Sequence, residues 1–166
     1  MEKIVIAGGG FAGISAGLYL KKHLPKSSTK LILIDKNPFH LFTPSLYEVA
    51  TSEEPQKNIA IPLFEIFGNS IELITSEIIK IDPKIQNIKL KNGEDISFDY
   101  LIIALGSEPA FYDIDGLTEY SFPLKTTVDG VKIKDKVHKL CDLNAAKEKE
   151  VYIVVGGGGF SGTELA

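Results

Sequence analysis

Two glycine-rich segments have the residue types and the spacing that bind a phosphate. The pattern G-x-G-x-x-G occurs at Gly8, Gly10 and Gly13, and it occurs again at Gly157, Gly159 and Gly162. The first glycine of such a pattern permits a sharp turn, the second lets a pyrophosphate approach the backbone, and the third lets a helix pack close to a strand. The free N–H groups at the start of the following helix then face the anion. Each segment therefore predicts a dinucleotide-binding turn.

The elements around the first segment fit this prediction. An apolar run over residues 3–7 precedes the glycines, and an Ala/Leu-rich stretch over 14–24 follows them, which predicts a buried strand, a turn and a helix. The next apolar run, residues 30–35, ends in Asp35. A carboxylate in this place accepts hydrogen bonds from a ribose diol and repels a 2′-phosphate. Two alternatives remain: a strand–helix–strand unit without a ligand, and a methyltransferase-type site, which also uses a glycine loop and an acid.

The middle of the chain changes from helical to strand periodicity. Residues 77–82, 87–90 and 95–98 predict three short strands, with Asp82-Pro83 and Asn92-Gly93 supplying the turns between them. They form an antiparallel meander, inserted where a simple dinucleotide-binding domain has a helix. Residues 71–74 predict a third core strand, and 99–106 predict a strand that is apolar on both faces, as the interior of a parallel sheet requires.

The remaining segments predict helices and loops. Thr43 or Ser45 caps a short helix, whose N-terminus is either a plain surface feature or is aimed at a flat, electron-rich ligand. Residues 51–58 predict an exposed loop, 62–67 a short helix stopped by Gly68, and 126–149 a longer helix. The single cysteine, Cys141, falls on this last helix, where we expect a buried and inert thiol.

The second glycine segment follows an apolar run over 151–155, which predicts another buried strand, and a helix begins at Thr163. The sequence stops within the first turn of that helix, so we expect it to be the front portion of a longer protein. The predicted organisation is an N-terminal part of one nucleotide-binding domain over 1–110, a connecting segment with a helix over 111–150, and the truncated start of a second such domain over 151–166.

Bulk properties exclude several classes of protein. The 166 residues carry 18 basic and 22 acidic side chains, a net charge of -4, which argues against a general nucleic-acid binder. One cysteine allows no internal disulfide, which suits a reducing compartment. No apolar run reaches the ~18 residues of a transmembrane helix, and Met1 leads directly into a strand rather than into a secretory signal. We expect a cytoplasmic location.

Taken together, these motifs resemble those of the FAD-dependent pyridine nucleotide–disulphide oxidoreductase superfamily. The resemblance rests on the two glycine turns, the meander, and the strand ending in Ala104-Leu105-Gly106. Within this superfamily, segment 39–50 is similar to type II NADH dehydrogenase, although Ser45 stands where those enzymes usually have a leucine. The resemblance implies an α/β fold: a Rossmann-like FAD-binding domain with a parallel sheet and an inserted three-stranded meander, followed by the first strand of a Rossmann-like NAD(P)H-binding domain.

The resemblance also implies which residues would contact the cofactors. Those expected at the pyrophosphate of FAD are Gly8, Gly9, Gly10, Phe11, Ala12 and Gly13, and those expected at the pyrophosphate of NADH or NADPH are Gly157, Gly158, Gly159, Phe160, Ser161 and Gly162. Asp35 would bind the adenosine ribose of FAD, Lys36 and Asn37 would flank the adenosine, the backbone of Ile78 would contact adenine, and Ala104 and Gly106 would lie near the pyrophosphate or ribose.

Three residues are the catalytic candidates that the resemblance implies. Thr43 and Pro44 would lie at the edge of the isoalloxazine, where a helix start could stabilise the anionic reduced ring, and Glu164 would lie near the contact between nicotinamide and flavin. His40 either approaches the flavin or is a loop histidine without a catalytic role. His23, His40 and His138 are too scattered to predict a metal site.

The activity implied by the resemblance is electron transfer from NADH, through flavin, to a quinone. Residues 36–55 contain no cysteine, which excludes the dithiol chemistry of the disulphide reductases, and Cys141 alone cannot do the work of a sulfide:quinone reductase. We expect no oxidoreductase activity from the 166 residues alone. In the family, C-terminal amphipathic helices hold the enzyme on the cytoplasmic face of the membrane; a homodimer and the choice between NADH and NADPH stay open.

Two other functions compete with this one. The first is another two-dinucleotide-binding flavoprotein, of the ferredoxin-reductase or apoptosis-inducing-factor type, and segment 39–50 argues against it. The second is a non-catalytic module that binds FAD or NAD without turnover. The methyltransferase alternative is weakened by the meander and by the second glycine turn, because one cofactor needs only one such loop.

Overall fold

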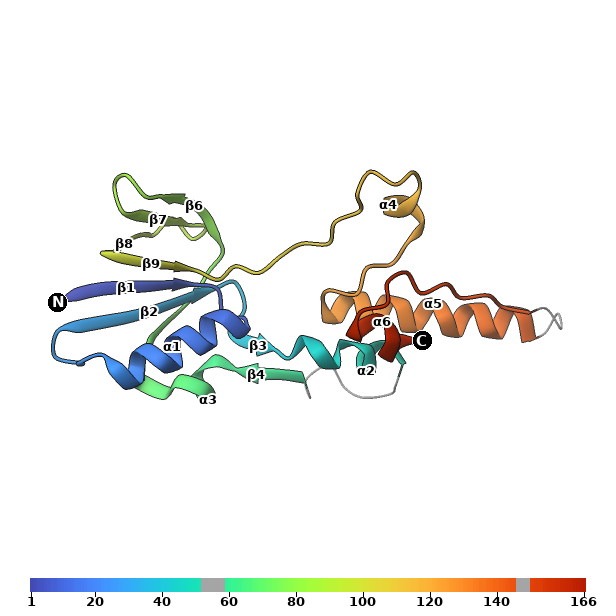
Figure 1. Cartoon of the computed structure of the whole chain (residues 1–166), viewed down its shortest axis with the longest axis horizontal. Helices are drawn as coiled ribbons and strands as arrows, with labels where there is room; N and C mark the ends of the chain where they lie inside the picture. The colour runs from blue at the N-terminus through green and yellow to red at the C-terminus, as the bar shows by residue number, and fades with distance from the viewer. Residues whose placement is uncertain (52–58, 146–149) are drawn as a thin grey trace. The chain divides into compact units, whose positions relative to one another are not determined.

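The computed structural model describes residues 1–51, 59–145 and 150–166 (Figure 1). The chain divides into two compact units. The first unit comprises Met1–Leu41 and Ala60–Ser107, and the second comprises Phe42–Ile59 and Glu108–Ala166.

A four-stranded parallel sheet forms the centre of the first unit, with the strand order β5-β2-β1-β9. The strands predicted for this unit and the first helix are confirmed to within three residues, and the helix begins directly at the glycine turn. The elements of this unit are β1 (Glu2–Ala7), α1 (Phe11–His23), β2 (Thr29–Asp35), β3 (Phe39–Leu41), β4 (Ala60–Pro62), α3 (Leu63–Phe67), the 3-10 turn η3 (Gly68–Ser70), β5 (Glu72–Thr75), β6 (Ile78–Asp82), β7 (Asn87–Leu90), β8 (Asp95–Ser97) and β9 (Tyr100–Ile103).

Neighbouring residues of each strand point to opposite sides of the sheet, and other elements cover both of its faces. On one face, Ile6 and Leu33 pack with α1 and α3, where Phe67 is the largest buried side chain. On the other face, Val5 and Ile34 pack against the meander of β6, β7 and β8 (Figure 1). The meander therefore occupies the place of a covering helix, as the sequence predicts.

Strand β9 differs from its prediction. It lies at an edge of the sheet and pairs only with β1 among the described residues, and Tyr100 and Ile103 are more than half exposed. The sequence predicts a strand buried on both faces because its residues are apolar throughout. Apolar composition does not reveal whether a strand has one neighbour or two, and in the described part of the chain this strand has one.

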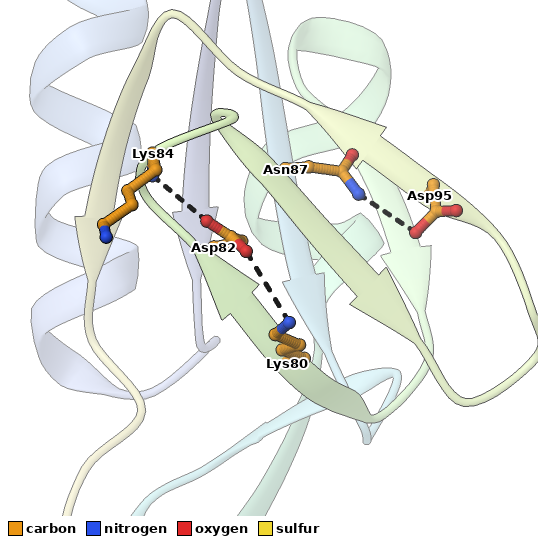
Figure 2. A network of polar contacts seen from close by, with 5 residues as sticks. All are labelled: Lys80, Asp82, Lys84, Asn87 and Asp95. Carbon is orange, nitrogen blue, oxygen red and sulfur yellow. Dashed lines mark hydrogen bonds and ion pairs between the residues drawn. The ribbon is translucent and has the colours of Figure 1, made fainter.

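Short-range polar contacts hold one turn of the meander and join two of its strands. In the turn after β6, Asp82 accepts a hydrogen bond from the Lys84 backbone N–H at 3.2 Å and forms an ion pair with Lys80 at 3.6 Å (Figure 2). Between β7 and β8, Asn87 donates to Asp95 at 3.0 Å (Figure 2). The predicted Asn92-Gly93 turn forms with Gly93 at φ +90°, a backbone angle that glycine readily adopts.

A second, two-stranded sheet in the first unit has no counterpart in the sequence analysis. Strands β3 and β4 pair antiparallel, with His40 opposite Ile61. Each strand has only three residues, and about twenty residues of chain separate them. Local periodicity therefore cannot predict that these two strands pair. Helix α3 then ends at Gly68 (φ +55°), as predicted.

The second unit is helical, and α2 packs against both α5 and α6. The start of α5 is capped reciprocally: Asp129 accepts from the Thr126 backbone N–H at 2.8 Å, and the Asp129 N–H donates to the Thr126 hydroxyl at 3.2 Å. The elements are the 3-10 turn η1 (Thr43–Ser45), α2 (Leu46–Thr51), α4 (Leu117–Tyr120), α5 (Thr127–Ala145) and α6 (Phe160–Leu165). Most of the predicted loop 51–58 and the last four residues of the predicted helix 126–149 lie outside the described residues.

Two expectations for this unit are wrong. Cys141 is exposed rather than buried, although it stands about three helical turns beyond the buried Gly130 and therefore on nearly the same side of α5. Residues 151–155 form no strand, and Val154 is 91% exposed. A parallel strand needs a neighbour to accept and donate its hydrogen bonds, and no described strand lies beside this segment. None of the described helices is long and apolar enough to cross a membrane.

Candidate dinucleotide-binding site

The first glycine turn is a tight loop that a side chain would break at two positions. Gly8 has φ +110°, and a Cβ atom there would lie 2.2 Å from the carbonyl oxygen of Ala104 on the neighbouring chain segment. A Cβ atom at Gly13 would lie 1.8 Å from the carbonyl oxygen of Gly8. At Gly10 no atom of the described residues lies within 4 Å of the position of a Cβ, so the turn is open on that side. A ligand can therefore approach the backbone at Gly10.

Helix α1 starts from this turn in a form that suits an anion. Gly10 is its N-cap residue and provides no side chain to cap the helix, and the first turn contains no acidic residue. Ala12 and Phe11 are exposed, the latter by 47%. The partial positive charge of the helix start is therefore not neutralised by a carboxylate of the helix itself.

Asp35, at the end of β2, joins the strand to the glycine turn. Its Oδ2 accepts the Gly9 backbone N–H at 2.6 Å, and its Oδ1 accepts the Asn37 backbone N–H at 2.7 Å. Each carboxylate oxygen has a further lone pair, so Asp35 can still accept a hydroxyl. Asp35 therefore fixes the turn and keeps acceptor capacity for a ligand.

A cleft of about 190 Å³ lies beside the turn, at the carboxyl end of the sheet. It is lined by Gly8, Ile34, Asp35, Lys36, Ser76, Glu77, Ile78 and Leu105. The structure therefore brings four predicted site residues, Gly8, Asp35, Lys36 and Ile78, to one hollow. A larger hollow of about 380 Å³ near η3 and β5 contains no residue of the turn and none of the predicted site.

Ala104 and Gly106 flank this cleft, on either side of its lining residue Leu105. The Ala104 backbone N–H donates to the Ala7 carbonyl at 2.7 Å, which continues the β1–β9 pairing by one residue. Gly106 follows with φ +82° and is exposed. The segment after β9 is therefore held directly against the glycine turn at Gly8.

Two side chains near the turn have contacts that the sequence does not reveal. Glu77 lines the cleft and forms an ion pair with Lys91 at 2.7 Å; its hydrogen bond with Lys91, and then the charge of Lys91, lower the pKa of Glu77. His40 on β3 is buried, and its Nδ1 lies 3.1 Å from the Gly9 carbonyl oxygen. The Glu77–Lys91 pair joins the two ends of the β6–β7 hairpin, whereas the contact of His40 with Gly9 spans 31 residues and has no local sequence signal.

The second glycine turn repeats the local geometry of the first. Gly157 has φ +113°, and a Cβ atom at Gly162 would lie 1.9 Å from the Gly157 carbonyl oxygen. Gly159 is the N-cap residue of α6 and has no side-chain cap. Gly158, Ser161 and Phe160 are exposed, Phe160 by 88%.

The catalytic candidates all lie in the second unit. Thr43 and Pro44 form the start of η1, with Thr43 half-buried and Pro44 exposed. Glu164 lies on α6, which packs on α2. Burial, followed by the charges of Glu48 and Glu164, raises the pKa of Tyr47 on α2. Among the described residues, no group of three or more His, Cys, Asp or Glu side chains gathers to hold a metal ion.

Comparison with protein families gives one match over nearly the whole chain. Residues 2–166 match the family described as pyridine nucleotide-disulphide oxidoreductase. Among curated proteins, demethylphylloquinone reductase NdbB of Synechocystis is 34% identical over 99% of this chain, and the type II NADH:quinone oxidoreductase of Staphylococcus epidermidis is 28% identical over the same share. The chain spans 42% of the length of each relative.

Solved structures with a similar fold come from related oxidoreductases. The sulfide:quinone oxidoreductase of Aquifex aeolicus is 28% identical with a TM-score of 0.73, over 86% of this chain and 33% of that one. The NADH:rubredoxin oxidoreductase of Clostridium acetobutylicum is 28% identical with a TM-score of 0.68, over 99% and 40%. NDH2 of Plasmodium falciparum, at 23% identity, shares the fold with a TM-score of 0.77, over 99% and 35%.

Proposed function

Because the chain belongs to the pyridine nucleotide-disulphide oxidoreductase family, we propose that its first glycine turn binds the adenosine diphosphate part of FAD. One observation supports this proposal most strongly: the Gly8–Gly13 turn, the uncapped start of α1 and the side chain of Asp35 lie together beside one cleft. On this proposal, residues 1–110 begin the FAD-binding domain, 111–150 connect, and 151–166 begin the NAD(P)H-binding domain.

The residues present fit the ADP part of FAD. The turn is closed against side chains at Gly8 and Gly13 and open at Gly10, which suits the close approach of a pyrophosphate to backbone N–H groups. Asp35 has acceptor capacity for the ribose diol, and its charge would repel a 2′-phosphate, which FAD lacks. The cleft beyond it, with Ile78 on its wall, would take the adenine. Lys36, Asn37, Ala104 and Gly106 would border this ligand.

We further propose that Gly157–Gly162 binds the pyrophosphate of NADH or NADPH. The proposal is supported by the backbone angles and the close Gly157–Gly162 approach, which match those of the first turn. Thr43 and Pro44 would lie at the flavin ring, and Glu164 near the nicotinamide. When bound, FAD would supply the chemistry, accepting a hydride from the nicotinamide and giving electrons to the second substrate.

The electron acceptor that we propose is a quinone. Two curated relatives, from Synechocystis and Staphylococcus, are named as a demethylphylloquinone reductase and a quinone oxidoreductase. The chain has one cysteine, Cys141, so no pair of thiols within it can carry dithiol chemistry. Since the chain spans 42% of these relatives, the whole reaction is proposed for a protein of their length. Such a protein would attach peripherally to the cytoplasmic face of a membrane.

Binding of ADP and FAD to the 166-residue chain tests the cofactor proposal. Titration calorimetry should show one site for either ligand, and FAD should compete with ADP for it. A folded chain that binds neither ligand, or that binds S-adenosylmethionine at this turn, would refute the proposal.

Turnover tests the electron-transfer proposal. A protein that contains these residues and has the length of the relatives should oxidise NADH with a soluble quinone, whereas the 166-residue chain alone should not. Reduction of a small redox protein without reduction of quinone would favour the ferredoxin-reductase alternative. In the longer protein, Thr43→Ala and Pro44→Ala should shift the flavin potential; unchanged potential and turnover would remove these residues from the flavin site.

A further inference from the structure

His40 is the one polar or charged side chain that is fully buried among the residues whose burial is described, with 5% of its surface exposed. It lies on β3, opposite Ile61 of β4, and its ring contacts the glycine turn of the same unit. A histidine that is buried in this way needs a hydrogen-bond partner, because an unpaired polar group away from water is costly.

The partner of His40 is the middle of the phosphate-binding turn. Its Nδ1 lies 3.1 Å from the Gly9 carbonyl oxygen, and since a carbonyl can only accept, Nδ1 must carry the proton. The ring of Phe11 meets the imidazole edge-on, with the centroids 4.7 Å apart. The N–H of Gly9 donates to Asp35. Two side chains from different strands therefore fix the orientation of Gly9 through its N–H and its carbonyl.

This orientation matters for an anion. A carbonyl oxygen carries partial negative charge, so a Gly9 carbonyl that rotated toward the open side of the turn at Gly10 would repel a phosphate. In the structure, Gly9 is buried and its carbonyl is engaged by a buried ring instead. The side of the turn at Gly10 thus remains available to N–H donors.

We propose that His40 is a positioning residue for the phosphate-binding turn: its Nδ1–H holds the Gly9 carbonyl inward, so that N–H groups rather than a carbonyl face the diphosphate. The inference rests on the proposed function of this turn. It differs from a purely structural role of a buried histidine, because it requires that the loss of the hydrogen bond weakens binding of phosphate in particular.

Three substitutions separate the two roles in the 166-residue chain. The side-chain nitrogen of His40→Asn can occupy the place of Nδ1, whereas that of His40→Gln reaches farther, toward the place of Nε2, and His40→Phe keeps a ring without a donor. Calorimetry with ADP, and with adenosine as the phosphate-free control, gives the ratio of the two affinities. Loss of fold lowers both affinities, so this ratio reports on the phosphate contact.

We expect His40→Gln and His40→Phe to bind ADP roughly tenfold more weakly with adenosine binding unchanged, and His40→Asn to bind ADP like the wild type. Equal ratios of ADP affinity to adenosine affinity in the His40→Asn, His40→Gln and His40→Phe variants would overturn the inference, while the proposed function would stand. Failure of the wild-type chain to bind ADP would overturn both. Nitrogen NMR of the wild-type ring provides a test without substitutions: a neutral imidazole protonated at Nε2 alone would also overturn the role of His40.

Discussion

The two glycine turns have almost the same shape and entirely different surroundings. Gly8 and Gly157 have φ +110° and +113°, and the N-cap glycines that follow have φ -77° and -76°. The last glycine of each turn approaches the carbonyl of the first so closely that a Cβ would lie 1.8 or 1.9 Å from it. Six residues with the right glycines therefore suffice to set this loop and to start a helix.

The surroundings of the turns show what the loop cannot do alone. A Cβ at Gly8 would meet the carbonyl of Ala104, whereas a Cβ at Gly157 would meet no atom of the residues that the structure describes within 4 Å. The first turn also has hydrogen bonds to Asp35 and His40, each from another strand. The segment before the second turn is unpaired within the described residues, with Tyr152 82% exposed. A phosphate loop becomes a nucleotide site only when a sheet brings other strands to its edge.

The largest expected effect comes from adding one methyl group to each turn. Gly8→Ala should lower the free energy of unfolding by more than about 3 kcal/mol, because it combines a strained positive φ with a clash against the Ala104 backbone. Gly157→Ala has the same strain without the clash, and its segment can relax, so we expect less than about 1 kcal/mol. Urea unfolding followed by circular dichroism measures both. Equal losses would show that the sheet contact at Gly8 contributes nothing.

The next effect separates binding from stability. Gly10 has room for a side chain and an ordinary negative φ, so Gly10→Asp should fold and should cap α1, gaining a few tenths of a kcal/mol. The new carboxylate would stand where we propose the diphosphate binds, and like charges near a surface should weaken ADP binding roughly a hundredfold.

Gly159→Asp is the matched control in the second turn. It caps α6 in the same way, with no atom from the described parts of the chain to obstruct the side chain, and should leave ADP binding at the first turn unchanged. Calorimetry with ADP checks both variants. Undiminished ADP affinity in Gly10→Asp would place the diphosphate elsewhere.

Asp35→Ala would give the first turn surroundings closer to those of the second. The N–H groups of Gly9 and Asn37 would lose their acceptor, which should cost about 2 kcal/mol of unfolding free energy, and ADP affinity should fall as well. Asp99→Ala is the control, since Asp99 accepts the backbone N–H of Lys3 at 2.7 Å outside the cleft. It should lower stability less and leave ADP affinity unchanged; parallel effects of the two variants on ADP binding would contradict a ligand role for Asp35.

The smallest effect concerns how helices begin. Both glycine turns start helices without a side-chain cap, whereas α5 starts with the Thr126–Asp129 capping box. Thr126→Ala should cost about 1 kcal/mol of unfolding free energy, measured by urea unfolding, with ADP binding unchanged. A loss of ADP affinity in this variant would show that the cap of α5 also shapes the nucleotide site.

The same cap predicts a pH dependence. Burial alone would raise the pKa of Asp129, but hydrogen bonds from Thr126 and Lys125 outweigh it and lower the pKa below its ordinary value. A lowered pKa in the folded state means that the unfolded chain binds a proton first as the pH falls. The stabilisation is therefore complete at neutral pH and is lost in acid, between the ordinary pKa and the lower folded one. Asp129→Asn should flatten that part of the pH profile.

Features that depend on residues close together in the sequence could be predicted from the sequence. The glycine spacing predicts both turns and a helix after each, although both helices begin three residues earlier than predicted, and Asn92-Gly93 predicts the hairpin turn. The family and the fold class also follow from these motifs, because each motif encodes its own conformation. Asp35 is predicted at the cleft for the same reason, since it ends a strand whose length is set by its apolar run.

Pairing between strands that are far apart in the sequence could not be predicted, unlike that of the meander. The tertiary structure alone decides that β9 is an edge strand, that β3 and β4 pair, and that residues 151–155 have no partner among the described strands. It also decides that the buried His40 reaches Gly9 and that Cys141 faces solvent. Composition and periodicity tell whether a residue is apolar or polar. Whether it is buried, and what it hydrogen-bonds, depends on residues far apart in the chain. The sequence by itself thus determined the shape of the phosphate turns, and long-range packing decided which of them has the side chains of a site around it.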